Sequence, residues 1–171
     1  MAVRKADPSD AWGIAGIHVA CWQAAYRGIL PDNTLDTLSA DRVEEAWKKR
    51  LHEGGDHVLV YDREGRILGF TSFGASRDED EDPSLVGEIY QLYLDPGEWR
   101  KGIGSTLTAA VLEALRKKGF SEVTLWVLKE NKRGRGFYEA LGFESDGAEK
   151  VETRRDGTVM NEIRYRLNLA L

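Results

Sequence analysis

The sequence has a single cysteine and no long hydrophobic run, and each of these shortages excludes a class of protein. A single cysteine, Cys21, among 171 residues means that no disulfide can form within the chain. No apolar run approaches the roughly 18 residues that cross a bilayer. The first residues, MAVRKADPSD, lack the apolar stretch of a secretory signal. With 42% hydrophobic residues the chain is rich enough to build a core. We therefore expect a cytoplasmic globular protein that does not contact a membrane.

Positive charge is also in short supply. Lys and Arg total 24 against 29 Asp and Glu, a formal net charge of −5, which argues against a nucleic-acid partner. The charge is uneven, because residues 77–82 read RDEDED and residues 129–135 read KENKRGR. Charge runs are usually solvated faces. The acidic run can alternatively attract an amine, and the basic run can hold an anion.

The spacing of apolar residues predicts the order of the elements. Helical spacing predicts helices over residues 8–26, 103–118 and 132–141, and another through Val43 and Leu51 that ends at Gly54-Gly55. Strand-like runs cover residues 3–6, 57–61, 67–73, 85–94, 123–128, 148–153 and 159–167. This order predicts a single domain over residues 1–171 of the α/β (α+β) class. Its central sheet is expected to be mixed and mostly antiparallel, with helices on both faces and one central β-α-β crossover.

The segment that carries most chemical information is LYLDPGEWRKGIGSTL, residues 92–107. A strand runs into a turn, and Gly102-Ile103-Gly104 then opens a helix. A helix N-terminus exposes unpaired N–H groups and favours anions, and glycine lets a bulky oxyanion approach. The segment therefore suits a phosphate or pyrophosphate, and Gly104→Val is expected to block it. Alone, such a GxG pattern is more often a tight turn, and neither the P-loop nor the dinucleotide pattern is complete.

A second segment, NKRGRGFYEALGF at residues 131–143, directly follows the strand VTLWVL. Together the two segments resemble the GNAT superfamily of acetyl-CoA-dependent N-acetyltransferases, small bacterial type. The matching positions are Gly102, Gly104, Asn131, Gly134, Phe137, Tyr138, Gly142 and Phe143. One departure is plain, because Trp99 stands where the family motif has Gln or Arg, and Arg100 stands where many members have Gly.

The resemblance implies acetyl-CoA as cosubstrate and assigns a set of residues to it. The pyrophosphate is expected at Arg100, Lys101, Gly102, Ile103, Gly104 and Ser105. The pantetheine arm is expected along Leu92, Tyr93 and Leu94, with the backbone N–H of Leu92 as oxyanion donor. Asn131, a helix cap in its own right, is also expected to contact the coenzyme. Arg133 and Arg135, and more weakly Lys129, are candidates for the nucleotide phosphates, and Trp22 and Tyr26 for the acceptor side.

Amine acetylation requires a proton acceptor, an oxyanion donor and a proton for the departing thiolate. Tyr138 is the candidate acid, because a phenol with a pKa near ~10 stays protonated at neutral pH and can donate to a thiolate of pKa ~8.5. Glu88 is the candidate base, directly or through water. Each has a structural alternative, as a core tyrosine or an edge-strand glutamate. Cys21, mid-helix on an apolar stripe, is not expected to be a nucleophile, and no metal-ligand spacing is present.

The sequence thus predicts an N-acetyltransferase that acts by direct attack of a primary amine through a tetrahedral intermediate. The amine belongs to a small molecule or to a protein. The alternative is a non-catalytic acyl-CoA-binding sensor. The acceptor is left open, as is the oligomeric state, for which a homodimer is one alternative.

Overall fold

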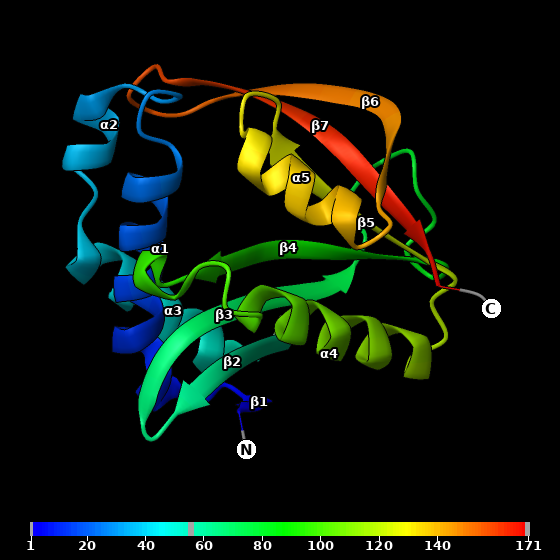
Figure 1. Ribbon diagram of the computed structural model, residues 1–171, viewed down its shortest axis with the longest axis horizontal. Helices are drawn as coiled ribbons and strands as arrows, with labels where there is room; N and C mark the ends of the chain where they lie inside the picture. Colours follow the sequence, from blue (N-terminus) through cyan, green and yellow to red (C-terminus); the bar gives the residue numbers. More distant parts are fainter. Residues whose placement is uncertain (1, 55–56, 170–171) are drawn as a thin grey trace.

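A seven-stranded sheet in the order β1-β2-β3-β4-β5-β7-β6 crosses the molecule (Figure 1). The computed structural model describes residues 2–54 and 57–169. Neighbouring strands are antiparallel except β4 and β5, which are parallel and joined through a helix. The strands are β1 (Val3–Lys5), β2 (His57–Arg63), β3 (Arg66–Ala75), β4 (Val86–Leu94), β5 (Glu122–Leu128), β6 (Glu144–Thr153) and β7 (Val159–Asn168). The expected mixed sheet with one β-α-β crossover is confirmed.

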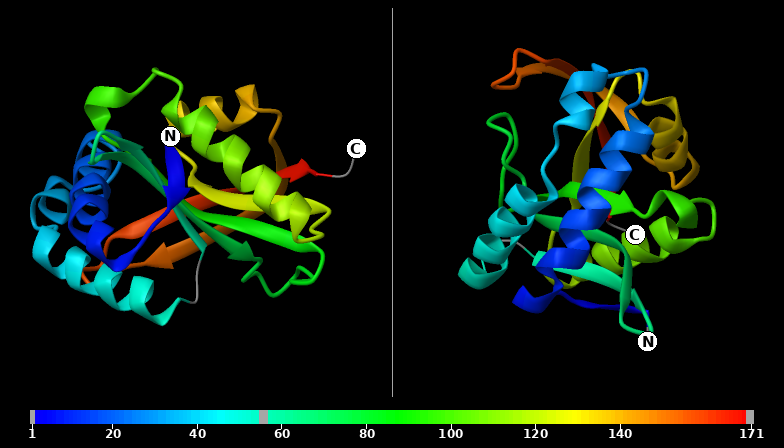
Figure 2. Two further views of the ribbon diagram at one scale, coloured as in Figure 1. Left: turned by 90° about the horizontal axis from the view of Figure 1, so that it is seen from below. Right: turned by 90° about the vertical axis from the view of Figure 1, so that its left-hand side faces the viewer.

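Helices cover both faces of this sheet (Figure 2). On one face, α1 (Ala11–Ala25) and α3 (Ala40–Glu53) pack on β2 and β3, and α2 (Asp32–Asp36) lies beside the end of α1. On the other face, α4 (Ile103–Lys117) and α5 (Lys132–Ala140) pack on β4, β5 and β7. Short 3-10 turns, η1 (Pro8–Asp10) and η2 (Pro96–Glu98), precede α1 and α4. None of these helices is long and apolar enough to cross a bilayer.

The ends of α3 follow from local chemistry. Ser39 caps its start, with Oγ accepting from the Arg42 N–H at 3.3 Å, and Gly54 ends it with a left-handed φ of 69°. The predicted stop at Gly54 is confirmed, while Gly55 lies outside the described residues. The five-residue helix α2 was not predicted, because it is too short to show a helical period.

The central parallel pair is short. β4 and β5 are paired from Val86–Glu122 to Ile89–Leu125, and beyond these residues the two strands part. A bulge lies at the parting point, because Ile89 pairs with Phe73 and Gln91 with Ser72 of β3, so that β4 has one extra residue, Tyr90, between these two pairs. The sheet therefore opens in its middle, between the second halves of β4 and β5.

The bulge shifts the side-chain alternation of β4 by one residue. Gly87 and Ile89 face α4, so Glu88 faces the side of α1 and α3. After the bulge, Leu92 faces α4 and Gln91 reaches Arg50 of α3. Simple alternation along residues 85–94 predicts that Glu88 shares a face with Leu92. This prediction is wrong, because the extra residue turns the second half of the strand over.

Candidate active site

A cavity of about 1130 Å³ lies where β4 and β5 part. Its walls come from the C-terminal half of α1, the second halves of β4 and β5, the loop before α4, the start of α5 and the β6–β7 hairpin. Most predicted site residues line it, namely Trp22, Tyr26, Glu88, Leu92, Tyr93, Leu94, Arg100, Gly102, Gly104, Ser105, Asn131, Arg133 and Tyr138. Segments that are far apart in the sequence thus meet at one opening.

Two predicted residues lie off the cavity. The side chain of Ile103 is 2% exposed and packs in the core with Leu68 and Leu107. Lys101 turns its ammonium group to Glu98, with Nζ 3.3 Å from Oε2. At Ile103 only the backbone N–H remains available for a ligand, and at Lys101 the charge is already partnered.

The loop before α4 has a strained, left-handed backbone. Gly102 is the N-cap residue with a φ of 87°, and no side chain caps the helix, so the first-turn N–H groups have no capping partner. Arg100 is also left-handed, with a φ of 64°. Glycine adopts this conformation without strain, which gives a physical reason for a glycine at the Arg100 position in related sequences.

Gly104 lines the cavity and also has a packing role. A Cβ atom on Gly104 would lie 3.0 Å from Cζ of Phe137 and 3.3 Å from Cδ1 of Leu94. The glycine therefore allows α4 to pack closely against α5. Gly104→Val would disturb that packing before it met a phosphate, so the variant does not isolate ligand binding.

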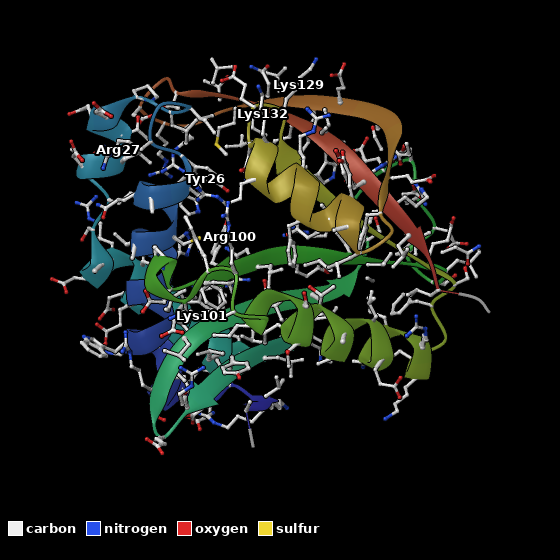
Figure 3. All side chains as sticks on the ribbon, viewed as in Figure 1. Tyr26, Arg27, Arg100, Lys101, Lys129 and Lys132 are labelled. Carbon is white, nitrogen blue, oxygen red and sulfur yellow. The ribbon has the colours of Figure 1, made fainter. Side chains whose placement is uncertain are left out.

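Three cations at this end of the cavity have no carboxylate within ion-pair distance among the described residues: Arg100, Lys132 and Arg133. The guanidinium of Arg133 lies over the ring of Trp99, 4.2 Å from its centroid. Trp99, which stands where the family motif has Gln or Arg, thus orients Arg133 of α5. Figure 3 places Arg100 at the gap between α1 and α5, with Lys132 at the start of α5. Positive charge here is free to meet phosphates.

Asn131 caps α5, as predicted. Its Oδ1 accepts from the Gly134 N–H at 3.0 Å. A Cβ atom on Gly134 would lie only 2.5 Å from Nδ2 of Asn131, so the small residue three positions on is required by the cap. Arg135 points elsewhere, because it donates to Tyr165 and to the carbonyl of Lys129. Arg133 lines the cavity and Arg135 does not.

The backbone of β4 presents a donor to the gap. Asp95 donates its N–H to Leu68 of β3, so by alternation Tyr93 and Gln91 also direct their N–H groups to β3. The N–H groups of Leu92 and Leu94 then face the opposite edge, where β5 is no longer paired, and that of Leu94 is hydrogen-bonded to the Cys21 thiol. An oxyanion in the gap would meet the Leu92 N–H.

Tyr138 reaches the same gap from α5. Its ring packs edge-on against Phe137 and Phe143, at 5.2 and 5.7 Å between centroids. Burial raises the pKa of its phenol well above the ordinary value, and the nearby Tyr93 and Cys21 add to this. Its hydroxyl makes no hydrogen bond to any other described residue. The group is therefore protonated at neutral pH and free to donate.

Glu88 is 3% exposed and bound to Arg77. The Arg77 N–H donates to Oε1 at 2.9 Å, and its guanidinium lies 3.2 Å from Oε2. Arg77 in turn stacks on Tyr90, 3.8 Å from the ring centroid. Glu88 lines the cavity, but a cation already partners its carboxylate.

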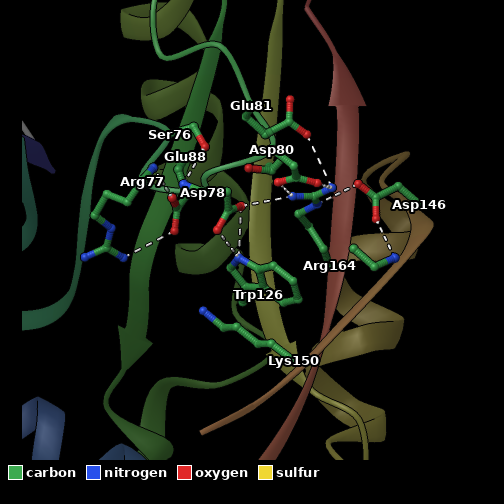
Figure 4. Close-up of polar contacts among 12 residues, drawn as sticks. Ser76, Arg77, Asp78, Asp80, Glu81, Glu88, Trp126, Asp146, Lys150 and Arg164 are labelled. Carbon is green, nitrogen blue, oxygen red and sulfur yellow. Dashed lines mark hydrogen bonds and ion pairs between the residues drawn. The ribbon is translucent and has the colours of Figure 1, made fainter.

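Part of the acidic run is paired within the protein, while Glu79, Asp80 and Asp82 are exposed. Residues 76–84 fold onto β7, where Arg164 donates to both carboxylate oxygens of Asp80 at 2.8 Å and lies 2.7 Å from Asp146 (Figure 4). Asp78 accepts from Trp126 at 3.0 Å, and Glu81 pairs with Arg166. The side chain of Arg164 is only 6% exposed. These carboxylates are therefore partnered within the protein, and their attraction for a substrate amine is weakened.

Sequence reasoning predicted the strands of the β6–β7 hairpin but missed that they line the cavity. Its residues on the cavity are Lys150, Glu152, Arg154, Met160 and Glu162. They occupy alternate positions of two paired strands, so they share one face of the hairpin. Polar residues at such positions ordinarily indicate a solvated face, and only the tertiary fold turns this face inward.

Cys21 is 8% exposed, and burial raises the pKa of its thiol to about 11. This agrees with the expectation that it is not a nucleophile. Among the described residues, no cluster of three or more His, Cys, Asp or Glu side chains is arranged to hold a metal ion.

Comparisons with known proteins identify the fold and the family. The chain is 36% identical over 131 residues to the N-acetyltransferase YuaI of Bacillus subtilis, covering 77% of this chain and 73% of that protein. It is 29% identical over 167 residues to a probable N-acetyltransferase of Mycobacterium tuberculosis, covering 96% and 92%. A GCN5-related N-acetyltransferase of Rhodopseudomonas palustris superposes with a TM-score of 0.78 at 20% identity, covering 98% and 94%.

A further solved structure, the putative acetyltransferase yncA of Salmonella typhimurium with its cofactor acetyl-CoA, has a TM-score of 0.71 at 23% identity and covers 100% of this chain and 95% of that one. The sequence profile of the acetyltransferase (GNAT) family matches residues 21–143, which include both segments that line the parted strands. The chain is therefore a member of the GNAT family of acetyltransferases, and acetyl-CoA is its cosubstrate.

Proposed function

We propose that the protein transfers the acetyl group of acetyl-CoA to a primary amine by direct attack. One observation carries this proposal most directly. Tyr138 lines the gap between the parted strands, and the Leu92 N–H of β4 faces the same gap. An acid and an oxyanion donor thus border the same opening, as acyl transfer to an amine requires.

The residues at one end of the cavity fit the coenzyme. The uncapped start of α4 and the free cations Arg100, Lys132 and Arg133 would hold its phosphates. The N–H of Leu92 and the neighbouring backbone of β4 would bind the amide-bearing arm along the strand edge that β5 leaves open. When bound, the coenzyme supplies the activated acetyl group.

The chain's own residues supply orientation and proton transfer. The Leu92 N–H stabilises negative charge on the acetyl oxygen as the amine nitrogen bonds to the carbonyl carbon. Tyr138 donates its proton to the sulfur as the carbon–sulfur bond breaks. Glu88, whose carboxylate is paired with Arg77, or a water beside it, takes the proton that the nitrogen loses.

The test measures both products. Purified protein is incubated with acetyl-CoA and a panel of primary amines, and thiol release is followed together with mass detection of the N-acetyl product. We expect turnover on at least one amine class. Coenzyme A binding by calorimetry without turnover on any amine would instead favour an acyl-CoA sensor.

A further inference from the structure

The acceptor end of the cavity has its own pattern of charge, carried by the β6–β7 hairpin. Arg154 extends the ladder of β6, with its N–H donating to Thr158 at 2.8 Å. Thr158 is buried and its hydroxyl lies 2.7 Å from that of Thr34 in α2. The hairpin end is thereby fixed against the helices of the opposite wall, and its inward face has a defined position.

Arg154 is a cation without a counter-ion. Its Nε is buried with no hydrogen bond, and among the described residues no carboxylate lies within ion-pair distance of its guanidinium. The neighbouring Asp156 is committed elsewhere, since it accepts from Thr34 at 3.1 Å and from the Thr158 N–H at 2.9 Å. The guanidinium lies 5.1 Å from the ring centroid of Trp22, which fixes its plane.

An unpaired, half-buried guanidinium is unfavourable unless a ligand supplies the anion. Other arginines of the chain show the contrast. Arg77 has Glu88 at 3.2 Å, and Arg164 has several carboxylates within ion-pair distance. The structure therefore leaves a bidentate anion site open at Arg154.

Glu162 is the complementary group. Its side chain is 14% exposed, and Oε2 is buried with no hydrogen bond. The nearest cation, Lys150, lies 3.6 Å away and is shared with Glu152 at 3.4 Å. Burial raises the pKa of Glu162, and Lys150 only partly opposes this. A carboxylate in this setting gains a full partner when an ammonium group enters the cavity.

The two groups are ordered along the hairpin. Glu162 pairs in register with Leu128 of β5, at the end of the strand that borders the gap. Arg154 lies four positions along β6 from Lys150, the partner of Glu162, a backbone separation of about 13 Å. The carboxylate is thus at the gap, and the guanidinium is deeper toward α1.

We propose that the acceptor is a small zwitterionic molecule, an amine that also carries a carboxylate or similar anion, with its amine bound by Glu162 and its anion by Arg154. This inference rests on the proposed acetyltransferase function. It makes Glu162 and Arg154 the determinants of acceptor specificity at the end of the cavity opposite the coenzyme phosphates.

The first experiment compares matched acceptors. α-Amino acids and ω-amino acids of increasing length are each compared with the corresponding carboxamide, which keeps the amine and removes the negative charge. We expect kcat/KM to be at least tenfold higher for the carboxylates. Equal kcat/KM for both members of every active pair would overturn the proposal.

Variants assign the two roles. Arg154→Gln should raise the KM of carboxylate acceptors at least tenfold and leave the carboxamides within twofold, and Arg154→Lys should restore part of the loss. Glu162→Gln should lower kcat/KM at least tenfold for both members, with the KM of acetyl-CoA unchanged. The exposed neighbours Arg155→Gln and Glu144→Gln are the matched controls. Carboxylate preference that survives Arg154→Gln would refute the assignment.

A binding measurement separates this inference from the proposed function. Calorimetry of an amino carboxylate with the protein saturated with coenzyme A requires no turnover. Binding that weakens at least tenfold in Arg154→Gln supports the anion site even if no amine is acetylated, in which case the transfer reaction alone fails. Binding of equal strength in the two proteins would overturn the anion site whatever the activity.

Discussion

The two ends of the active-site cavity are built in different ways. At the coenzyme end, the main features belong to the backbone: the left-handed turn at Gly102, the uncapped start of α4 and the free edge of β4. At the acceptor end, they belong to side chains of the β6–β7 hairpin and α1, held by tertiary contacts. A site built from backbone requires particular residue types at fixed spacings, which appear in the sequence as a motif. A pocket built from side chains of distant segments produces no such motif. Variants at each end therefore test whether donor and acceptor binding are separable.

The largest effect is expected at Tyr138, where the two ends meet. Tyr138→Phe keeps the ring packing against Phe137 and Phe143 but removes the proton donor. kcat should fall by about 10²–10⁴, with the KM of acetyl-CoA unchanged, as measured by steady-state thiol release. Tyr61→Phe, on β2 away from the cavity, is the control. A kcat within twofold of the parent would make Tyr138 a packing residue only.

Arg164 should be the residue whose loss most affects stability. Arg164→Met leaves the carboxylates of Asp78, Asp80 and Asp146 without their shared partner, in a setting where the arginine is 6% exposed. We expect the free energy of unfolding to fall by about 3 kcal/mol, toward the low end for a buried pair because Asp80 is 62% exposed. Urea denaturation measures it. Lys117→Met, which breaks an exposed pair with Glu113, should change stability by less than about 1 kcal/mol.

His18 should make stability depend on pH at the acceptor end. Burial, aided by Arg50 and Arg154, lowers its pKa from 6.5 to about 4, and its Nδ1 accepts from Trp47 at 3.4 Å. Between these values the unfolded chain binds the proton and the folded chain does not, so stability falls as the pH drops from 6.5 toward 4. His18 alone should lower the free energy of unfolding by about 2 kcal/mol between pH 7 and pH 5.

The measurement is the urea midpoint as a function of pH. His18→Gln should flatten the profile between pH 7 and pH 5, while the exposed His52→Gln should leave it unchanged. A profile that keeps its slope in His18→Gln would show that other groups carry the dependence.

The smallest expected effect tests the Trp99–Arg133 contact at the coenzyme end. Arg133→Ala should raise the KM of acetyl-CoA about tenfold, or about 1.4 kcal/mol, and Trp99→Ala should raise it in the same direction by disordering the guanidinium. The acceptor KM should not change. Lys129→Ala serves as control, because Lys129 is paired with Glu149. Unchanged affinity in Arg133→Ala would leave the phosphates to Arg100 and Lys132.

Sequence reasoning recovered most helices and strands, because they are long enough to show a helical or alternating pattern of apolar residues. Most of them also end at capping or turn residues. Ser39, Gly54 and Gly119 mark helix ends, and Asp156-Gly157 marks the last hairpin. It missed α2, with five residues, and the bulge at Tyr90, a one-residue event that no local pattern announces. That bulge is the reason that the faces of Glu88 and Leu92 were assigned incorrectly.

The parts of the site that depend on local motifs were predicted, and the parts that depend on tertiary contacts were not. The Gly102 turn, the Asn131 cap and Tyr138 were located from their spacings, and all line the cavity. Arg154 and Glu162 were missed, because their inward position depends on the contact between Thr158 and Thr34, 124 residues apart. The acidic run was interpreted as solvated or substrate-facing, because Arg164 and Arg166, the partners of Asp80 and Glu81, lie 84 and 85 residues away in the sequence.

The parting of β4 and β5 has a consequence for the mechanics of the sheet. It creates two strand edges in the interior of the molecule, with backbone donors and acceptors that lack a neighbouring strand. A ligand with amide groups can pair with them as a short inserted strand would. The free protein has an incompletely hydrogen-bonded sheet at this point, and in the proposed complex the cosubstrate would connect its two halves. Binding of the cosubstrate to the folded chain would then raise the free energy of unfolding.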